Sequence, residues 1–278
     1  MRRPTARPSS STEELRPIPS GLHFLLAEDG AVNQAVFMGL LASRGHEVSA
    51  VEDGQQAIDA WRKGKFDAIF MDVQMPLLDG LEATRMIREQ EQTLGGSRIP
   101  IIAITAGALD SDQEQCFAAG MDEYLTKPID VEELDRILAQ LHPGAPSETA
   151  TPASADATDN PPTRHSDSIN LSTPLARLKC SAEQHRQLVS TLGQELRQRL
   201  NEISQALETH SDKLLVRASH SLKSAAALFE ANRVVNIAAA IEQHARAGAS
   251  AHARSRFPEL REATAEILVV IDQWLNEP

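Results

Sequence analysis

The most constraining feature of this chain is a fivefold alternation of short apolar runs and helix-like segments in its first half. The apolar runs lie at 22–27, 47–51, 67–71, 100–104 and 122–125. The segments between and after them carry apolar side chains three and four residues apart, as Leu134, Ile137 and Leu138 do. Strand followed by helix, five times over, predicts an α/β domain: a doubly wound (βα)5 parallel sheet with helices on both faces.

The second half of the chain has no strand pattern. Its apolar spacing predicts four helices joined by short loops, at 182–208, 212–230, 232–247 and 258–275. Short connections between amphipathic helices predict a separate all-α four-helix bundle. A short leading helix near Leu171 to Leu178 is a further expectation.

Two polar tracts set the predicted domain boundaries. Residues 142–168 are rich in Pro, Ala, Ser and Thr and almost free of large apolar side chains, so we expect a flexible linker. Residues 1–20 are predicted to be a disordered leader for the same reason. The sequence therefore predicts an α/β domain at 21–141 and a helical domain at 169–278.

Charge and hydrophobicity exclude several classes of protein. Residues 21–141 carry 21 acidic residues against 9 Lys and Arg, which argues against nucleic-acid binding because phosphate backbones require clustered cations. No stretch of about 18 apolar residues occurs, so no membrane span is expected. Cys116 and Cys180 lack metal-ligand spacing and stand alone in separate domains, which favours a reducing, cytoplasmic location.

Polar residues follow most of the predicted strands. Glu28 and Asp29 follow the first, Asp72 the third and Thr105 the fourth, and Lys127 stands shortly after the fifth. One polar residue at a strand end is ordinary. Because right-handed crossovers place the carboxyl ends of parallel strands along one edge, we expect all of these side chains to meet there.

This set of side chains suits phosphoryl transfer. Clustered carboxylates favour a hard cation with oxygen ligands, Mg²⁺ or Mn²⁺, which Asp29 and Asp72 would hold while Glu28 acts one shell further out. Asp72 is then predicted to be the nucleophile that becomes an aspartyl phosphate. Lys127 would neutralise phosphoryl oxygens, and the Thr105 hydroxyl would donate to another.

The segments AEDGAVNQ, MDVQMPLLDG, ITAGA and YLTKP resemble the signature blocks of receiver domains of two-component response regulators, in particular those attached to hybrid sensor kinases. The resemblance implies a flavodoxin-like fold with Asp72 as phospho-acceptor. It implies that Asp29 and the backbone carbonyl of Gln74 help hold Mg²⁺, that Thr105 and Tyr124 form a switch pair, and that a cis bond precedes Pro128. Gly30 stands where Asn is common in that family, which implies a looser loop.

The predicted helix at 212–230 carries a histidine that its apolar stripe does not include. The buried face is predicted by apolar residues that recur at three and four positions: Leu214 or Leu215, Ala218, Leu222, Ala225 and Phe229. His220 lies about 200° round the helix from Ala218 and Leu222, so we expect it to point toward solvent. Three neighbours share its side of the helix: Arg217, Lys223 and Ser224. Lys223 and Arg217 could balance the charge of a phosphoryl group on this imidazole.

The segment ASHSLKSAAALFEA resembles the phospho-histidine motif of histidine phosphotransfer (HPt) domains, and the later NIAAAIEQHARAG resembles the helix that follows it in that family. The resemblance implies that His220 is a second phospho-acceptor and that Lys223 contacts the phosphate. Ser224 replaces the usual Gly, which bears on how closely a partner can approach.

The two resemblances together predict a phosphorelay protein. No ATP-binding region is recognisable, so the phosphoryl group is expected to come from a sensor histidine kinase rather than from a kinase activity of the chain. Asp72 is its expected entry, and His220 would exchange it with Asp72 or with a downstream response regulator receiver domain. Two alternatives remain: a docking module that does not exchange phosphate, and an aspartate-nucleophile phosphatase, which normally has a second Asp where this chain has Gln74.

Overall fold

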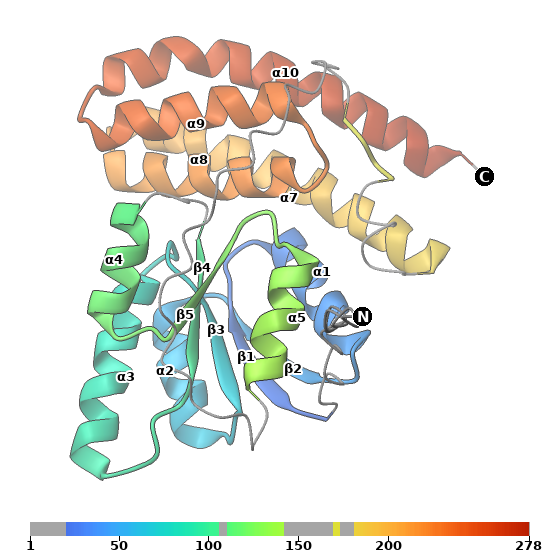
Figure 1. The fold of residues 1–278 in the computed structure, drawn as a ribbon. Coiled ribbons are helices and arrows are strands. Elements are labelled where there is room, and N and C mark those ends of the chain that lie inside the picture. Colours follow the sequence, from blue (N-terminus) through green and yellow to red (C-terminus); the bar gives the residue numbers. More distant parts are fainter. Residues whose placement is uncertain (1–20, 106–109, 142–168, 173–180, 278) are drawn as a thin grey trace, which may run out of the picture.

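A computed structural model of the protein describes residues 21–105, 110–141, 169–172 and 181–277. The predicted leader at 1–20 and the predicted linker at 142–168 lie outside these residues, as does nearly all of the predicted leading helix at 171–178. Two domains are described: an α/β domain and a helical domain (Figure 1).

The α/β domain is built on five parallel strands, as the alternation of apolar runs predicts. They are β1 (His23–Ala27), β2 (Glu47–Val51), β3 (Ala68–Asp72), β4 (Ile101–Thr105) and β5 (Glu123–Thr126). Their spatial order is β2-β1-β3-β4-β5, the order of a flavodoxin-like doubly wound sheet. Strands β3 and β4 each run one residue further than predicted, so Asp72 and Thr105 are the last residues of their strands.

Five helices cover the two faces of this sheet (Figure 1). One face carries α1 (Ala31–Ala42) and α5 (Val131–Gln140), and the other carries α2 (Gly54–Lys63), α3 (Gly80–Leu94) and α4 (Asp110–Ala119). Alternation along the strands divides the core, since Phe24 and Leu26 pack toward α1 and α5 whereas Leu25 and Ala27 pack toward α2 and α3. The sheet is therefore buried on both faces, and its carboxyl edge is left for a site.

Most of the helix starts in the α/β domain are capped from within the domain. The side chains of Asp53, Asp79 and Asp130 accept hydrogen bonds from backbone N–H groups of α2, α3 and α5 respectively. Helix α1 is different, because its N-cap residue is Gly30 and no side-chain cap comes from that position.

The helical domain contains α7 (Ala182–Glu208), α8 (Asp212–Ala227), α9 (Asn232–Arg246) and α10 (Ser250–Asn276). The bounds of α7 agree with the prediction, but α10 begins at Ser250 rather than at 258 and carries Pro258 inside it. An interior proline removes one backbone hydrogen bond, yet Ala253 and Leu260 are buried on either side of it, and this packing holds the helix together. None of the described helices has the length and apolarity that crossing a membrane requires.

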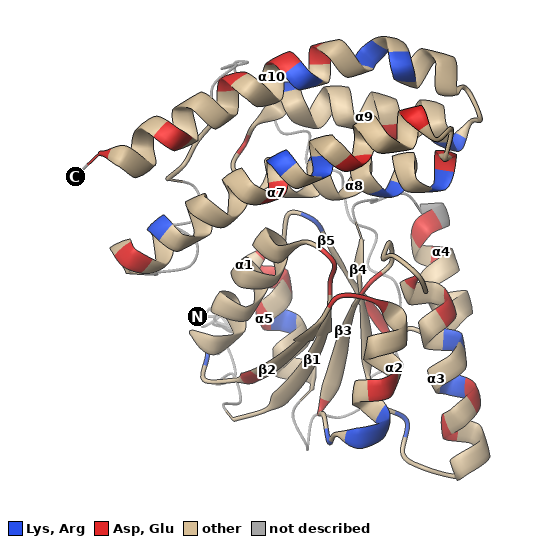
Figure 2. Ribbon diagram, turned by 180° about the vertical axis from the view of Figure 1, so that it is seen from behind, with Lys and Arg blue, Asp and Glu red and all other residues tan. Residues whose placement is uncertain are grey.

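The helical domain lies across the carboxyl edge of the sheet (Figure 1). Helices α7 and α8 face the α/β domain, and both contact α1. Figure 2 shows Asp and Glu as well as Lys and Arg on both the helices above and the α/β domain below, so charges of the two signs are not divided between the domains. The strand ends therefore face the second domain rather than open solvent.

Candidate functional site

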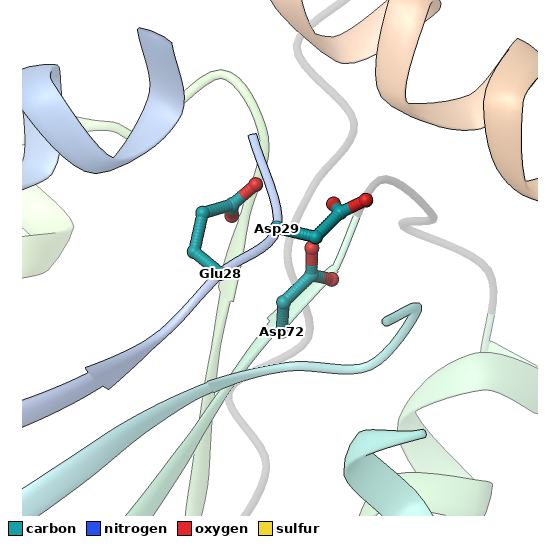
Figure 3. A group of neighbouring side chains, drawn as sticks. All are labelled: Glu28, Asp29 and Asp72. Atoms are coloured by element: carbon teal, nitrogen blue, oxygen red, sulfur yellow. The ribbon is translucent and has the colours of Figure 1, made fainter. Parts of the chain in front are cut away.

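Three carboxylates gather at the carboxyl edge of the sheet. Glu28 and Asp29 follow β1, Asp72 ends β3, and one carboxylate oxygen from each lies within 4.8 Å of the others (Figure 3). The two strands are parallel neighbours with Ala27 opposite Met71, which brings the residues that follow together. The predicted meeting of these acids is confirmed.

The Lys127 ammonium pairs with two of the three acids. Its Nζ lies 2.6 Å from Oε2 of Glu28 and 2.7 Å from Oδ2 of Asp72. Burial raises the pKa of Asp72, the Lys127 charge opposes this, and the Glu28 charge adds to it. Arg199 lies 3.5 Å from the Asp29 carboxylate, so two cations face three carboxylates and leave excess negative charge, which a divalent cation would neutralise. The donor set therefore fits Mg²⁺.

Each of the three acids has hydrogen-bond or ion-pair partners among the described residues. Both oxygens of Glu28 are engaged, because Oε2 contacts Lys127 while Oε1 accepts from Asn33 Nδ2 at 2.9 Å and from the Gly30 N–H at 3.2 Å. Asp72 Oδ1 accepts from the Gln74 N–H at 3.0 Å. Asp72 Oδ2 contacts Lys127, and Asp29 Oδ2 accepts from Ser221, so all three acids have partners. The metal roles predicted for Asp29 and Asp72 stay predictions. The metal role predicted for the Gln74 carbonyl stays a prediction.

Thr105 and Tyr124 lie on the neighbouring strands β4 and β5. Thr105 is buried and lines a cavity at the domain boundary. The half-buried ring of Tyr124 packs edge-on against Phe117, with 6.2 Å between ring centroids. The peptide bond between Lys127 and Pro128 is cis, as expected. The switch role of the Thr105 and Tyr124 pair stays a prediction.

His220 does not point toward solvent, and this prediction is wrong. Its exposed fraction is 3%. The residues predicted for the opposite stripe are buried, but helix α9 and the α/β domain cover the face that carries His220. A helical wheel counts only positions within one helix, so it could not show that a second domain lies against this face.

A carboxylate from α9 holds the imidazole. His220 Nδ1 lies 2.9 Å from Oε1 of Glu242. The same carboxylate accepts from Lys223 Nζ at 2.6 Å and from Arg246 at 2.5 Å. The Lys223 ammonium is therefore already paired with the Glu242 carboxylate. Its predicted contact with phosphate stays a prediction.

This network determines which ring nitrogen can react. A carboxylate only accepts hydrogen bonds, so the proton of the neutral ring lies on Nδ1, and Nε2 carries a lone pair. Burial lowers the pKa of His220, although the hydrogen bond to Glu242 opposes that shift. Nε2 is buried and has no hydrogen-bond partner among the described residues. The imidazole is therefore held neutral, with its unprotonated nitrogen available.

A cavity of about 910 Å³ lies at the domain boundary beside His220, and Asp72 is not among its lining residues. The α/β domain contributes Gln74 and Thr105 to its lining, and the helical domain contributes His220, Lys223 and Arg246. A direct contact lies beside the cavity, because Ser221 Oγ donates to Asp29 Oδ2 at 3.0 Å. The residue next to His220 thus touches the acid cluster.

Comparison with known families decides what these two domains are. The family model described as response regulator receiver domain matches residues 24–139, and the model described as Hpt domain matches residues 187–269. The chain is a receiver domain followed by an Hpt domain. The predicted family resemblances are confirmed.

Curated relatives of the receiver domain are histidine kinases. Hybrid signal transduction histidine kinase I of Dictyostelium discoideum is 44% identical over 119 residues, which is 41% of this chain and 7% of that protein. Sensor protein GacS of Pseudomonas syringae is 40% identical over 114 residues, 41% of this chain and 13% of that protein. The chain thus spans only a small part of the length of these relatives.

Solved structures similar to this chain include a receiver domain with a bound ion. The receiver domain of sensor histidine kinase PA1611 from Pseudomonas aeruginosa, with magnesium coordinated in its active-site cleft, is 48% identical, with a TM-score of 0.40. The alignment covers 44% of this chain and 98% of that one. A complex of Ypd1 with the receiver domain of Ssk1 from Saccharomyces cerevisiae is 29% identical, with a TM-score of 0.43, and covers 44% and 89%.

Four residues of the site were not predicted from the sequence: Glu195, Arg199, Ser221 and Glu242. Glu242 had a detectable signal, because it interrupts the apolar stripe of α9 between Ile241 and Ala245. A carboxylate within a buried stripe indicates a buried cation or hydrogen-bond donor nearby. The other three face the receiver domain across the domain boundary, and no spacing within the Hpt domain indicates such a partner.

Proposed function

We propose that this chain carries phosphoryl groups in a phosphorelay. Asp72 of the receiver domain accepts a phosphoryl group from a sensor histidine kinase, and His220 of the Hpt domain exchanges it with receiver domains, including its own. The observation that carries this proposal is Nε2 of His220, which has no hydrogen-bond partner among the described residues and lies on a helix whose next residue, Ser221, contacts Asp29 of the acid cluster.

At Asp72, the reaction forms one bond and breaks another. A carboxylate oxygen of Asp72 attacks the phosphorus of a phosphohistidine, the P–N bond breaks, and its electron pair returns to the donor imidazole. Lys127, already 2.7 Å from Asp72, balances the charge of the phosphoryl oxygens. The same steps in reverse pass the group to a histidine.

At His220, the nucleophile is Nε2. Its lone pair attacks the phosphorus of the aspartyl phosphate, and the P–O bond to Asp72 breaks. Glu242 keeps the proton on Nδ1 and stabilises the positive charge that the ring gains on phosphorylation. Lys223 and Arg246 line the cavity beside the ring, where their charges favour a phosphoryl group.

Asp29, Asp72 and the backbone carbonyl of Gln74 would hold Mg²⁺, and Mn²⁺ has the same ligand preference. The bound ion supplies positive charge that offsets the phosphoryl oxygens. Glu28 acts behind these ligands by holding Lys127 in place. Thr105 would donate its hydroxyl to a phosphoryl oxygen and, together with Tyr124, report phosphorylation.

The proposed partners are a sensor histidine kinase as donor and a downstream response regulator receiver domain as acceptor. The curated relatives of the receiver domain are themselves histidine kinases, which supports a two-component context. ATP-dependent histidine kinases act in the cytoplasm, so the proposal includes that location. The experiment below tests whether Asp72 receives the phosphoryl group before His220.

Labelling with radioactive acetyl phosphate and Mg²⁺ tests the proposal. The wild-type chain should carry a base-labile label at Asp72 and an acid-labile label at His220. Asp72→Asn should lose both labels, and His220→Gln should keep the first alone. Histidine label in Asp72→Asn on incubation with the donor kinase would reverse the proposed route.

One observation favours a second function, a docking module that does not exchange phosphate. Asp29 already accepts a hydrogen bond from Ser221 and lies 3.5 Å from Arg199, so the Hpt domain occupies a predicted metal ligand. That function predicts no label on either residue. Turnover of added phosphomonoesters would instead indicate a phosphatase.

A further inference from the structure

Helix α1 of the receiver domain begins without a cap of its own. Its N-cap residue, Gly30, has no side chain, and the first turn contains no acidic residue. The helix start nonetheless carries unpaired backbone N–H groups and partial positive charge, which an oxygen acceptor stabilises. The missing acceptor must come from elsewhere in the protein or from water.

The Hpt domain supplies that acceptor. Oε2 of Glu195, on α7, accepts a hydrogen bond from the Val32 N–H at 2.9 Å. Val32 is the second residue of α1, the position whose N–H an N-cap side chain normally binds. Glu195 is 4% exposed, so its carboxylate has left water for this contact. A side chain 163 residues away in the sequence thus caps α1.

Gly30 leaves the room for this carboxylate. A Cβ atom at Gly30 would lie 3.1 Å from Oε1 of Glu195, and 3.0 Å from polar atoms of Glu28 and Asn33. These distances are tighter than most Cβ contacts, and a longer side chain would extend further into the same space. Glycine at this position and the carboxylate of α7 are therefore sterically matched.

Arg199 holds the turn that precedes Gly30. It lies one helical turn after Glu195 on α7 and donates to the backbone oxygen of Asp29 at 2.8 Å. Its guanidinium also lies 3.5 Å from the Asp29 carboxylate and 3.7 Å from that of Glu195. We call Glu195 and Arg199 the α7 clamp, since together they hold the backbone on both sides of Gly30.

We infer that the α7 clamp and Gly30 determine which receiver domain this Hpt domain recognises, and that the occupant it fits is the receiver domain of its own chain. This inference rests on the proposed function, because it names the partner with which His220 exchanges phosphate. The clamp makes no hydrogen bond to either ring nitrogen of His220, but Arg199 contacts Asp29, a proposed metal ligand. Glu195 is therefore the residue of the clamp that tests specificity apart from the chemistry.

The physical basis of the selection is the cost of a buried charge without a partner. Docking removes Glu195 and Arg199 from water. Across the domain boundary the Val32 N–H then compensates Glu195 and the Asp29 carbonyl compensates Arg199, which keeps Glu202 as a partner within α7. A receiver domain with a side chain at the position of Gly30 would displace the carboxylate and leave it desolvated. Such a mismatch is a repulsive element of the kind that gives specificity.

Gly30→Asn and Glu195→Ala test the match, with Gly96→Asn and Glu208→Ala as controls. Gly96 has open space around it, and Glu208 is an exposed acid on the same helix. Asparagine is a good N-cap, so Gly30→Asn should keep the receiver domain folded and cap α1 from within. The radius of gyration of the full chain measures docking. The rate of transfer from Asp72 to His220 measures exchange.

Each of the two test variants should lower the transfer rate about tenfold or more and increase the radius of gyration, while both controls behave as wild type. Asp72 should still accept phosphate from acetyl phosphate at the wild-type rate. In Glu195→Ala, the Val32 amide should exchange with solvent faster. A wild-type transfer rate in both test variants would overturn the inference.

The double variant separates a matched pair from two independent effects. With Ala at 195, an Asn at 30 no longer meets the carboxylate of α7, and its close contacts with Glu28 and Asn33 are the same in both backgrounds. The Gly30→Asn change should therefore cost less further transfer than it costs the wild-type chain. If the fold-decrease in transfer rate of the double variant equals the product of the two single-variant decreases, a direct match between Gly30 and Glu195 is contradicted. If Asp72 takes no label even in the wild-type chain, the proposed function fails, whereas the radius of gyration still tests the clamp.

Discussion

At the scale of single residues, the site depends on buried charges that have specific partners. Glu242 is the clearest example, because one carboxylate receives the imidazole of His220, the ammonium of Lys223 and the guanidinium of Arg246. Burial by itself would raise its pKa, but His220 and Lys223 lower the pKa of Glu242 to about 2. Two predictions about this network concern its dependence on pH.

The first prediction concerns stability. The pKa of Glu242 in the folded protein lies below its ordinary value of 4.5, so its stabilising effect is present above pH 4.5 and is lost as the pH falls toward 2. Glu242→Gln should therefore lower the free energy of unfolding by about 3 kcal/mol at pH 7, and by progressively less in acid. Urea unfolding at pH 7 and pH 3 measures this, with the exposed Glu208→Gln as control. A pH-independent difference would contradict the prediction.

The second prediction concerns the protonation of His220. Burial disfavours the charged ring, so its pKa should lie below 6.5, and the imidazole should be neutral at that pH. In Glu242→Gln the pKa should fall further, because the carboxylate that favours the charged form is gone. NMR titration of the ring nitrogens measures the pKa in the wild-type protein and in the variant. A rise in the pKa of His220 on this substitution would contradict the assigned network.

At the scale of elements, the strand ends and the loops that follow them position the acids. Gly80 begins α3 directly beneath Asp72, and a Cβ atom there would lie 2.1 Å from the backbone oxygen of Asp72. Because the clash is with backbone, a larger residue at 80 must move either α3 or the end of β3. The reason for glycine here is space rather than an unusual backbone angle.

The third prediction follows from this contact. Gly80→Ala should lower the free energy of unfolding by about 1 to 3 kcal/mol, the usual cost of overpacking. It should also slow the labelling of Asp72 by acetyl phosphate, since the end of β3 shifts. Gly96→Ala, in open space, should change neither quantity. Normal labelling in Gly80→Ala would show that Asp72 tolerates movement of α3.

At the scale of the whole molecule, the arrangement that matters is the Hpt domain lying across the active edge of its own receiver domain (Figure 1). We propose that residues 142–168 tether the two domains, which would give each an effective concentration near the other of roughly millimolar. Exchange within one chain should then dominate over exchange between chains.

The fourth prediction tests this by dilution. Transfer from Asp72 to His220 in the wild-type chain should have a rate that does not depend on protein concentration. A mixture of phosphorylated His220→Gln and unphosphorylated Asp72→Asn, which can exchange only between chains, should transfer more slowly and in proportion to concentration. Equal rates in the two experiments at low micromolar protein would argue against exchange within the chain.

Local patterns in the sequence were sufficient for much of the fold and for the acid cluster. The apolar runs predicted all five strands to within one residue at either end, because the core of a parallel sheet excludes polar side chains. Asp29, Asp72 and Lys127 could be placed together because parallel strands end along one edge. The start of α10 could not be predicted from local patterns, because the burial of Ala253 and Leu260 outweighs the local effect of Pro258.

The amino-acid sequence by itself determined the two domains and the chemistry available to them: the carboxylates, the lysine and the histidine. Only the tertiary structure decided that His220 is buried, that Glu242 holds its Nδ1, and that the α7 clamp caps α1. The physical reason is range. Periodicity reports how one element packs against its own core. The contact of His220 with Glu242 joins two helices, and the contact of Glu195 with Val32 joins two domains. Such surfaces become complementary only after each element or domain has folded.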